Sequence, residues 1–516
     1  METASQPPAR PRWWQNEDWL AVLVGGVLIA VVLTFWRPAL PSFNWMTTAH
    51  FATEARALTA RTAELNQLQV EATHQGESAL AEALSALSGA LASEEHSTIR
   101  AAVKQVETAA ARATLAETAK PAQKFIAPLL SKRTGTLGAV VSAGNLQRAA
   151  VLGLIYLGIA VVAVRLLGGR VAGFAAGFPV LFALAGCAQA LAGNARINDF
   201  GLEYVIFALG LGLVLNHTVR LPDWLRQAVR TEFYIKSGLV ILGAGILFQE
   251  ILQAGLLGLA QSILVVTVVW YFCFWFAQRL RVDDEFAVML ATAVSICGVS
   301  AAIAACGAIQ GDRKKLSYVT SLVLIVALPM MILMPWVVKH FNIPEIVAGA
   351  WLGGTLDTSG SVVAAGALIS EPAMKTGVIV KFSQNVLLGV AAFGLSIWWT
   401  MRQRAAGGQR PSVRLIWERF PKFVLGFIVA SLVCSFALDP ALVKETKGLL
   451  TGLRNFWFAL AFVSIGLETK FTDLVRMEGG RPAFAFIGAQ GFNVIWTFIL
   501  AWLLFGGVMF AVPDIK

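Results

Sequence analysis

Long apolar runs separated by short polar connections make up most of the chain from residue 147 onward. A helix that crosses a bilayer needs roughly 20 apolar residues. Runs of about this length lie at residues 147–168, 171–192, 201–219, 232–252, 254–279, 285–310, 316–340, 344–370, 375–401, 420–438, 449–468 and 482–511. With an earlier run at residues 19–36, the pattern predicts an all-α polytopic membrane protein of about 13 transmembrane helices.

The first apolar run, residues 19–36, follows a short polar N-terminus, residues 1–18. It could be a signal peptide, but no convincing A-x-A cleavage site follows it. Trp36, Arg37 and Pro38 are typical of an interfacial stop. We therefore expect a retained first transmembrane helix.

Residues 45–144 have a different pattern, rich in Ala, Glu, Gln and Thr and almost without aromatic residues. Leucines recur there at helical spacing, at Leu58, Leu65, Leu68, Leu80, Leu84, Leu87 and Leu91. Breaks are expected at residues 74–76 and 93–95. The pattern predicts an insert of two or three helices outside the bilayer, with no clustered metal ligands and no catalytic set. We expect an assembly or spacer element, and a role in handling substrate is the alternative.

Composition and charge agree with a membrane protein. The chain is 57% hydrophobic and 14% charged, against about 25% charged residues in soluble domains, and its mean hydropathy is +0.68. The net charge of +10 fits the cytoplasmic excess of Lys and Arg and not a nucleic-acid partner. The Arg and Lys bias, with Arg313-Lys314-Lys315 as its main exception, predicts a cytoplasmic N-terminus, an extracytoplasmic insert and an extracytoplasmic C-terminus. The expected location is the inner membrane of a bacterial cell.

The five cysteines give no sign of a zinc site or a disulfide framework. All lie inside apolar runs, and none forms a CxxC pair. The sequence also has no Walker A, H-E-x-x-H or G-x-S-x-G pattern. The longest expected inward loop, at residues 403–417, is too short for an ATPase domain. Any transport is therefore expected to be secondary or channel-like.

A stretch of small and polar residues, Gly353–Gly366, interrupts one of the apolar runs with the sequence G-G-T-L-D-T-S-G-S-V-V-A-A-G. A carboxylate at mid-bilayer costs about 2.5–3.5 kcal/mol, so chains keep one only where it faces a cavity or a partner. Glycines and hydroxyls let a helix break and satisfy the backbone groups that the break exposes. We predict Asp357 as the ion-coupling group, and the predicted substrate ligands around it are Thr355, Thr358, Ser359 and Ser361.

The alternatives to an ion or ligand site in this stretch are structural or catalytic. Small residues let helices pack closely, and Asp357 could cap a structural kink. The Asp-Thr/Ser-Gly motif of aspartic proteases is interrupted here by Ser359, and no second copy exists.

A second interrupted run, Thr292–Gly307, has Ser295, Cys297, Gly298 and Ser300 at its centre. A helix broken near Gly298 would present free N–H groups and the positive end of a half-helix dipole, which suits an anion. Secondary transporters often bind substrate between two broken helices. The alternative is a helix crossing packed on glycine.

The helix expected after Asp357 carries Lys381, Gln384 and Asn385, which we also predict as substrate-binding residues. Lys381 could instead extend to the surface, as long cationic side chains do. Glu468 ends a later run and is expected to be solvated at the cytoplasmic interface. Gln490 and Asn493 are candidates for hydrogen bonds between helices.

Several of these pieces together resemble the YeiH-type family of sulfate exporters. The matches are S-I-C-G at Ser295–Gly298, G-x-T at Gly353–Thr355 and V-V-A-A-G at Val362–Gly366, with looser ones at Leu211–His217 and Gly466–Phe471. The resemblance runs from about Phe178 to the end. It implies kinship with bile-acid symporters and sodium/proton antiporters, an inverted-repeat core with crossed, broken helices, and export of an anion or sulfonate.

The chain departs from the family at its most informative stretch. Where the family has V-H-E-V-A-Q, this chain has Leu356 to Ser361, so that Asp357 replaces a His and Ser361 replaces a Gln; Gln384 stands where the family has an Arg. The resemblance therefore leaves open whether the substrate and the coupling ion are those expected for the family. By this helix count, the two interrupted runs cross the membrane in the same direction. The two helices of an inverted crossing pair would cross it in opposite directions.

These observations predict a secondary transporter, in the export direction, of a small anion such as sulfate or an organosulfonate. The expected coupling ion is a proton or sodium, with Asp357 as the sodium ligand in the second case. No catalytic residue and no other cofactor is expected. The expected partners are the anion and the lipid bilayer, and a homo-oligomer is left open. The alternatives are a channel-like anion pore, a sensor that uses the outer insert as receiver and, with the least support, an intramembrane enzyme.

Overall fold

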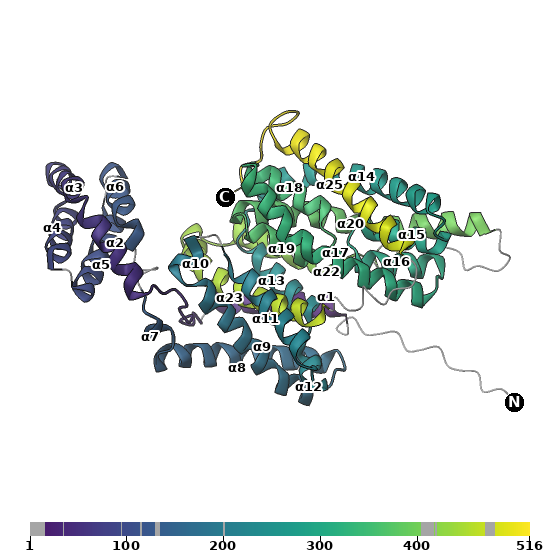
Figure 1. Ribbon diagram of the computed structural model, residues 1–516, viewed down its shortest axis with the longest axis horizontal. Helices are drawn as coiled ribbons and strands as arrows, with labels where there is room; N and C mark the ends of the chain where they lie inside the picture. Colours follow the sequence, from purple (N-terminus) through teal and green to yellow (C-terminus); the bar gives the residue numbers. More distant parts are fainter. Residues whose placement is uncertain are drawn as a thin grey trace. The chain divides into compact units, whose positions relative to one another are not determined.

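The computed structural model describes residues 16–34, 36–93, 95–113, 116–129, 135–199, 202–403, 417, 420–469 and 480–515. The predicted cytoplasmic residues 1–15 and the basic residues Arg404, Arg410, Arg414, Lys470 and Arg476 lie outside these ranges. The chain divides into two compact units (Figure 1). One comprises residues 1–38, 156–185 and 208–516, and the other residues 39–155 and 186–207.

The described residues are helical, apart from short connections and one isolated β-bridge between Trp45 and Asn194. Eight described helices are long and apolar enough to cross a membrane, which supports a polytopic membrane protein. They are α1 (Glu17–Thr34), α8 (Ala143–Leu166), α9 (Val171–Ala192), α14 (Phe248–Arg279), α17 (Arg313–His340), α20 (Glu371–Gln403), α23 (Pro440–Glu468) and α25 (Arg481–Phe505).

The other predicted spans are short or interrupted. They correspond to α11 (Tyr204–Thr218), α13 (Thr231–Gly243), α15 (Asp284–Ser295) with α16 (Val299–Ile309), α18 (Glu345–Thr355) with α19 (Ser359–Ala367), and α22 (Lys422–Leu432) with a π-helical turn at Val433–Ala437. A short helix, α12 (Asp223–Ala228), precedes α13. The count of 13 crossings and the inverted repeat therefore stay predictions.

The second unit contains the insert as a bundle of five helices, not two or three. These are α2 (Thr48–Thr59), α3 (Thr62–His74), α4 (Ser78–Ser93), α5 (His96–Arg112) and α6 (Ala116–Ile126), followed by a 3₁₀ turn at Ala127–Leu129 and by α7 (Leu137–Val140). The short α10 (Ala195–Asp199) belongs to the same unit. The predicted leucines pack in the core of the bundle, Leu68 at its edge. Gly76 lies just after α3 and has a positive φ of 77°. Glycine adopts this backbone conformation without strain, which suits it to the turn between α3 and α4.

One predicted helix boundary was wrong. The sequence suggested a break near residue 253, whereas the structure breaks at Ala244–Leu247 and then continues through the 32-residue α14. The start of α14 is fixed by polar contacts: the backbone N–H of Leu247 donates to the Glu250 carboxylate at 3.0 Å and that of Phe248 to Ser435 Oγ at 2.9 Å. These contacts satisfy N–H groups that a helix start leaves free.

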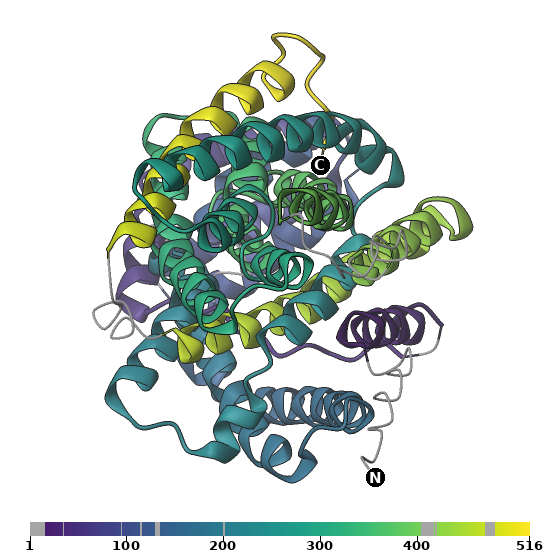
Figure 2. The ribbon, with the colours of Figure 1, turned by 90° about the vertical axis from the view of Figure 1, so that its right-hand side faces the viewer.

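Two groups of helices pack within the first unit. In one, α1 lies against α13, α22 and α23. In the other, α14 lies beside α25, as both views show (Figure 1 and Figure 2). Both helices contact α15 and α18, and α14 also contacts α20. Gly353 lets α18 approach α20 closely, because a Cβ there would lie 2.5 Å from the Gly377 carbonyl oxygen. The two broken helices, α15–α16 and α18–α19, belong to this second group.

Candidate functional site

The first break separates α15 from α16 at Ile296–Gly298. Gly298 has a φ of 57°, a conformation that glycine adopts readily and other residues rarely do. A Cβ on Gly298 would lie 2.6 Å from Val323 Cγ1 and 3.0 Å from the Cβ of Asp357. Gly298 therefore allows both the break and a close approach to Asp357, so the two predicted stretches meet at their interruptions.

The second break separates α18 from α19 at Leu356–Thr358. Thr358 is the N-cap of α19: its Oγ1 accepts the backbone N–H of Ser361 at 3.0 Å and lies 2.7 Å from the Ser361 hydroxyl. This is the usual way in which a threonine satisfies a free N–H at a helix start. The predicted ligands Thr358 and Ser361 are therefore also partners of each other.

The C-terminal ends of α15 and α18 face the same side chains of α20. Lys381 Nζ donates to the carbonyl oxygen of Ile296 at 2.5 Å and to Gln384 Oε1 at 2.7 Å. Gln384 Nε2 donates to the carbonyl oxygens of Ser295 at 2.8 Å and Gly354 at 3.3 Å. Both side chains thus satisfy carbonyl groups that the breaks leave without helical partners. Lys381 is only 1% exposed, so it does not extend to the protein surface.

Side chains of α25 complete the contacts on this side. Gln490 Nε2 donates to the Thr355 carbonyl oxygen at 2.9 Å, and Asn493 Nδ2 reaches the carbonyl oxygens of Thr355 and Val294, both at 3.3 Å. The hydroxyl of Thr497 donates to Asn493 Oδ1 at 2.7 Å. Gln490 and Asn493 thus form hydrogen bonds between helices, and their acceptors are carbonyl groups of the two broken helices.

Asp357 is buried without a hydrogen bond. Its residue is 1% exposed, and neither carboxylate oxygen has a hydrogen-bond partner among the described residues. Lys381 is the charged side chain that acts on it electrostatically. An isolated buried carboxylate is strongly disfavoured in its charged form, so this group calls for a proton or a cation. Thr355 Oγ1 and Gln490 Oε1 are also buried without hydrogen-bond partners among the described residues, and Gln490 bonds to the Thr355 carbonyl through its Nε2.

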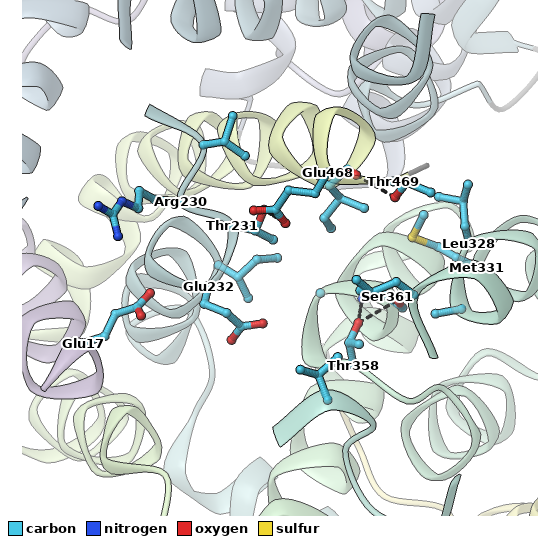
Figure 3. A pocket seen from close by; sticks show the side chains of 17 residues that line it. Glu17, Arg230, Thr231, Glu232, Leu328, Met331, Thr358, Ser361, Glu468 and Thr469 are labelled. Atoms are coloured by element: carbon cyan, nitrogen blue, oxygen red, sulfur yellow. Dashed lines mark hydrogen bonds between the residues drawn. The ribbon is translucent and has the colours of Figure 1, made fainter. Parts of the chain in front are cut away.

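The opposite ends of the breaks, the first residues of α16 and α19, face two cavities. The larger cavity has a volume of about 320 Å³ and is drawn in Figure 3. From these helices it is lined by Val299, Thr358, Gly360 and Ser361. The smaller cavity, of about 120 Å³, is lined by Cys297, Val299, Ser300, Thr358, Ser359 and Asn385. The first N–H groups of a helix have no partner within it, so two half-helix N-termini meet these cavities.

The predicted residues thus fall into two sets. Ser295, Thr355 and Asp357 lie at or just after the C-terminal ends of α15 and α18, and Lys381 and Gln384 of α20 bond to carbonyl groups there. None of these five residues lines either cavity. Cys297, Ser300, Thr358, Ser359, Ser361 and Asn385 line at least one of them. Gly298 lies at the junction, where it touches Asp357.

The sequence did not place the charged residues of the cavity walls at the site. Glu17, Arg230, Glu232 and Glu468 line the larger cavity, as Figure 3 shows. Glu468 is exposed, and its carboxylate accepts a hydrogen bond from the Thr231 hydroxyl at 2.9 Å. The acidic pair at residues 17 and 18 marks a helix start in the sequence, but nothing local indicates which cavity that start would face.

The smaller cavity adds an ion network between α1 and α13. Lys236 Nζ lies 2.9 Å from an oxygen of Asp18 and 3.5 Å from an oxygen of Glu232. Asp18 and Glu232 both line this cavity, as does Lys236. The first helix, which is long and apolar enough to cross a membrane, therefore also contributes charged groups to the cavity walls.

Comparison with known proteins identifies relatives of the membrane part. Residues 176–485 match the model of the family Conserved hypothetical protein 698. This range includes both breaks and Lys381 to Asn385, and leaves out Glu17, Asp18, Gln490 and Asn493. No solved structure matches.

Individual relatives are described as UPF0324 membrane proteins. One from Rhodopirellula baltica is 41% identical over 348 residues, which is 65% of this chain and 64% of the relative. Another, from Nitratidesulfovibrio vulgaris, is 35% identical over 67% of this chain and 62% of its own length. The alignments thus span less than two thirds of each of these relatives. Because the family model matches more than half of the chain, the protein belongs to the membrane protein family Conserved hypothetical protein 698.

Proposed function

We propose that the protein is a secondary transporter of a small anion, coupled to a proton or sodium gradient through Asp357. The observation that carries the proposal is a buried carboxylate without a hydrogen bond at the junction of two broken helices. Intramembrane ionisable groups commonly belong to ion or proton pathways, and transporters commonly bind substrate and ion where helices are interrupted.

The two ends of each break suggest how the roles divide. The cavities meet the N-terminal ends of α16 and α19, and exposed N–H groups with the positive end of a helix dipole favour an anion. Asp357 lies on the other side of the break, near the carbonyl ends of α15 and α18. In this proposal the anion binds at the cavities, and Asp357 binds and releases the coupling ion as access to the site changes sides.

The carboxylate of Asp357 suits either coupling ion. Both of its oxygens are buried without hydrogen-bond partners among the described residues. Oxygen ligands suit a hard cation such as sodium, and a proton on the carboxyl would equally remove the buried charge. Lys381, whose ammonium group is held by the Ile296 carbonyl, would compensate for the negative charge of Asp357 when the ion leaves.

The finer features of the proposal come from the resemblance to YeiH-type sulfate exporters. It suggests sulfate or an organosulfonate as substrate, export as the direction and the bacterial inner membrane as the location, with a cytoplasmic N-terminus. The replacement of a family His by Asp357 leaves the coupling ion open. Transport needs no catalytic residue and no cofactor beyond that ion.

Counterflow in proteoliposomes tests the proposal. Purified protein is reconstituted, and uptake of labelled sulfate and a panel of labelled organosulfonates is measured with and without an imposed pH or Na⁺ gradient. We expect saturable counterflow and accumulation that follows one of the gradients. Downhill flux that ignores both gradients would instead favour a channel-like pore, and absence of flux for every anion would overturn the proposal.

A further inference from the structure

Acidic side chains form one wall of the larger cavity. Figure 3 shows the carboxylates of Glu17, Glu232 and Glu468 on one side and Thr358 and Ser361 across from them. Arg230 is the basic residue of this cavity. A wall of this kind attracts positive charge and repels a bare anion.

The smaller cavity does not reverse this balance. It shares Glu232 with the larger one and adds Asp18 and Lys236. Lys236 is already engaged, 2.9 Å from Asp18 and 3.5 Å from Glu232. Among the described residues, four carboxylates and two basic side chains thus line the two cavities. This excess of negative charge suits a dianion such as sulfate poorly.

An independent observation points to a ligand with a hydrogen-bond donor. Asn385 is 5% exposed and lines the smaller cavity. Its Nδ2 donates to Ser359 Oγ at 3.2 Å, while its Oδ1 has no hydrogen-bond partner in the part of the chain that the structure describes. Buried amide oxygens normally accept a hydrogen bond, so a ligand N–H would complete this site.

The same cavities also offer groups that favour an anion. Gly298, the N-cap of α16, has no side chain to occupy the first N–H groups of that helix. In α19, Thr358 takes the N–H of Ser361, and the N–H groups of Ser359 and Gly360 at the helix start have no partner within the helix. The site thus combines donors for a negative group with acceptors for a positive one.

We propose that the substrate is a small zwitterion, an aminosulfonate or a molecule of similar charge pattern. Its anionic end lies at the N-termini of α16 and α19, and its ammonium group lies toward Glu232 and Asn385 Oδ1. This inference rests on the proposed function, because it assumes that the cavities hold the transported substrate.

The test compares a zwitterion with its two halves. Calorimetry on the purified full chain uses 3-aminopropanesulfonate, propane-1-sulfonate, propylamine and inorganic sulfate as probes. We expect 3-aminopropanesulfonate to bind at least about tenfold more tightly than each of the others, as charge-assisted hydrogen bonds are worth about a factor of ten or more. Glu232→Gln should weaken binding of the zwitterion about tenfold and leave propane-1-sulfonate nearly unchanged. The exposed Glu82 of the insert, as Glu82→Gln, is the matched control.

Every other ranking on the native chain overturns the inference. Equal or tighter binding of sulfate or propane-1-sulfonate would mean that the ammonium group is not recognised, and equal binding of propylamine would mean a simple cation site. Lack of binding by all four probes would also overturn it. None of these rankings decides whether an anion is transported with an ion, because the counterflow experiment measures that separately. If Glu232→Gln does not fold, the comparison of probes on the native chain still decides.

Discussion

Asp357→Asn separates an ion-coupling role of this residue from a structural one. The substitution keeps the size and shape of the side chain and removes its ability to bind a proton or to carry a negative charge. Asp357 is 1% exposed and accepts no hydrogen bond from any residue that the structure describes, so the substitution breaks no contact of this kind. We therefore expect a folded protein, with unfolding free energy within about 1 kcal/mol of the native chain.

The expected effect on transport is large. A pH difference of one unit is worth about 1.4 kcal/mol per proton, which for one proton exchanged per anion gives about tenfold accumulation. In proteoliposomes with this gradient, the native protein should reach that ratio, and Asp357→Asn should reach about 1. If sodium is the coupling ion, the same comparison holds with a tenfold Na⁺ gradient. Anion exchange without a gradient should persist in the variant, since the cavity residues are unchanged.

The control is Asp223→Asn, which makes the same chemical change at a side chain that is 93% exposed. It should accumulate anion as the native protein does. If Asp357→Asn is folded and accumulates anion with unchanged gradient dependence, Asp357 is a structural group and the proposed coupling mechanism is wrong.

Three further predictions concern a buried contact, the topology and the insert. Lys381→Met removes the donor to the Ile296 carbonyl and should lower the unfolding free energy by about 1–3 kcal/mol, as measured by thermal unfolding. The control Lys339→Met, at an exposed position, should leave the unfolding free energy unchanged. An equal loss in both variants would mean that the buried contact contributes little. Single cysteines at Ala60 and Ala405, in a background without native cysteines, should be labelled by an impermeant thiol reagent in intact spheroplasts only at Ala60, and the reverse would invert the topology. Replacing residues 47–131 by a flexible linker should leave a folded core that transports, and a core that folds but is inactive would show that the insert takes part in the mechanism.

Both breaks of the membrane part could be predicted from the sequence. Clusters of glycine and hydroxyl residues inside long apolar runs are local signals, so Gly298 and the residues around Asp357 stand out without a structure. The predicted polar residues of α20 also meet these breaks, since Lys381 and Gln384 bond to their carbonyl groups. The division of roles could not be predicted, because the two ends of a break look alike in a residue pattern.

The cavity walls depend on contacts between distant segments. Asp18 meets Lys236 and Thr231 meets Glu468, and in each pair more than 200 residues separate the partners. No local pattern encodes such pairs, so the sequence did not place Asp18 and Glu468 in the cavity walls. The boundary between α13 and α14 was missed for a related reason: the Ser435 hydroxyl that helps to fix it comes from another helix, while the apolar pattern continues across it.

Reciprocal flux tests most directly whether anion and coupling ion move together. Proteoliposomes loaded with the transported anion are diluted into anion-free buffer, with the membrane potential held at zero, and H⁺ and Na⁺ movements are followed by a pH-sensitive dye and by ²²Na⁺. We predict that the anion gradient alone drives net movement of one of these ions across the membrane, and that Asp357→Asn abolishes this movement. Anion efflux from the native protein without movement of either ion would contradict the proposed coupling.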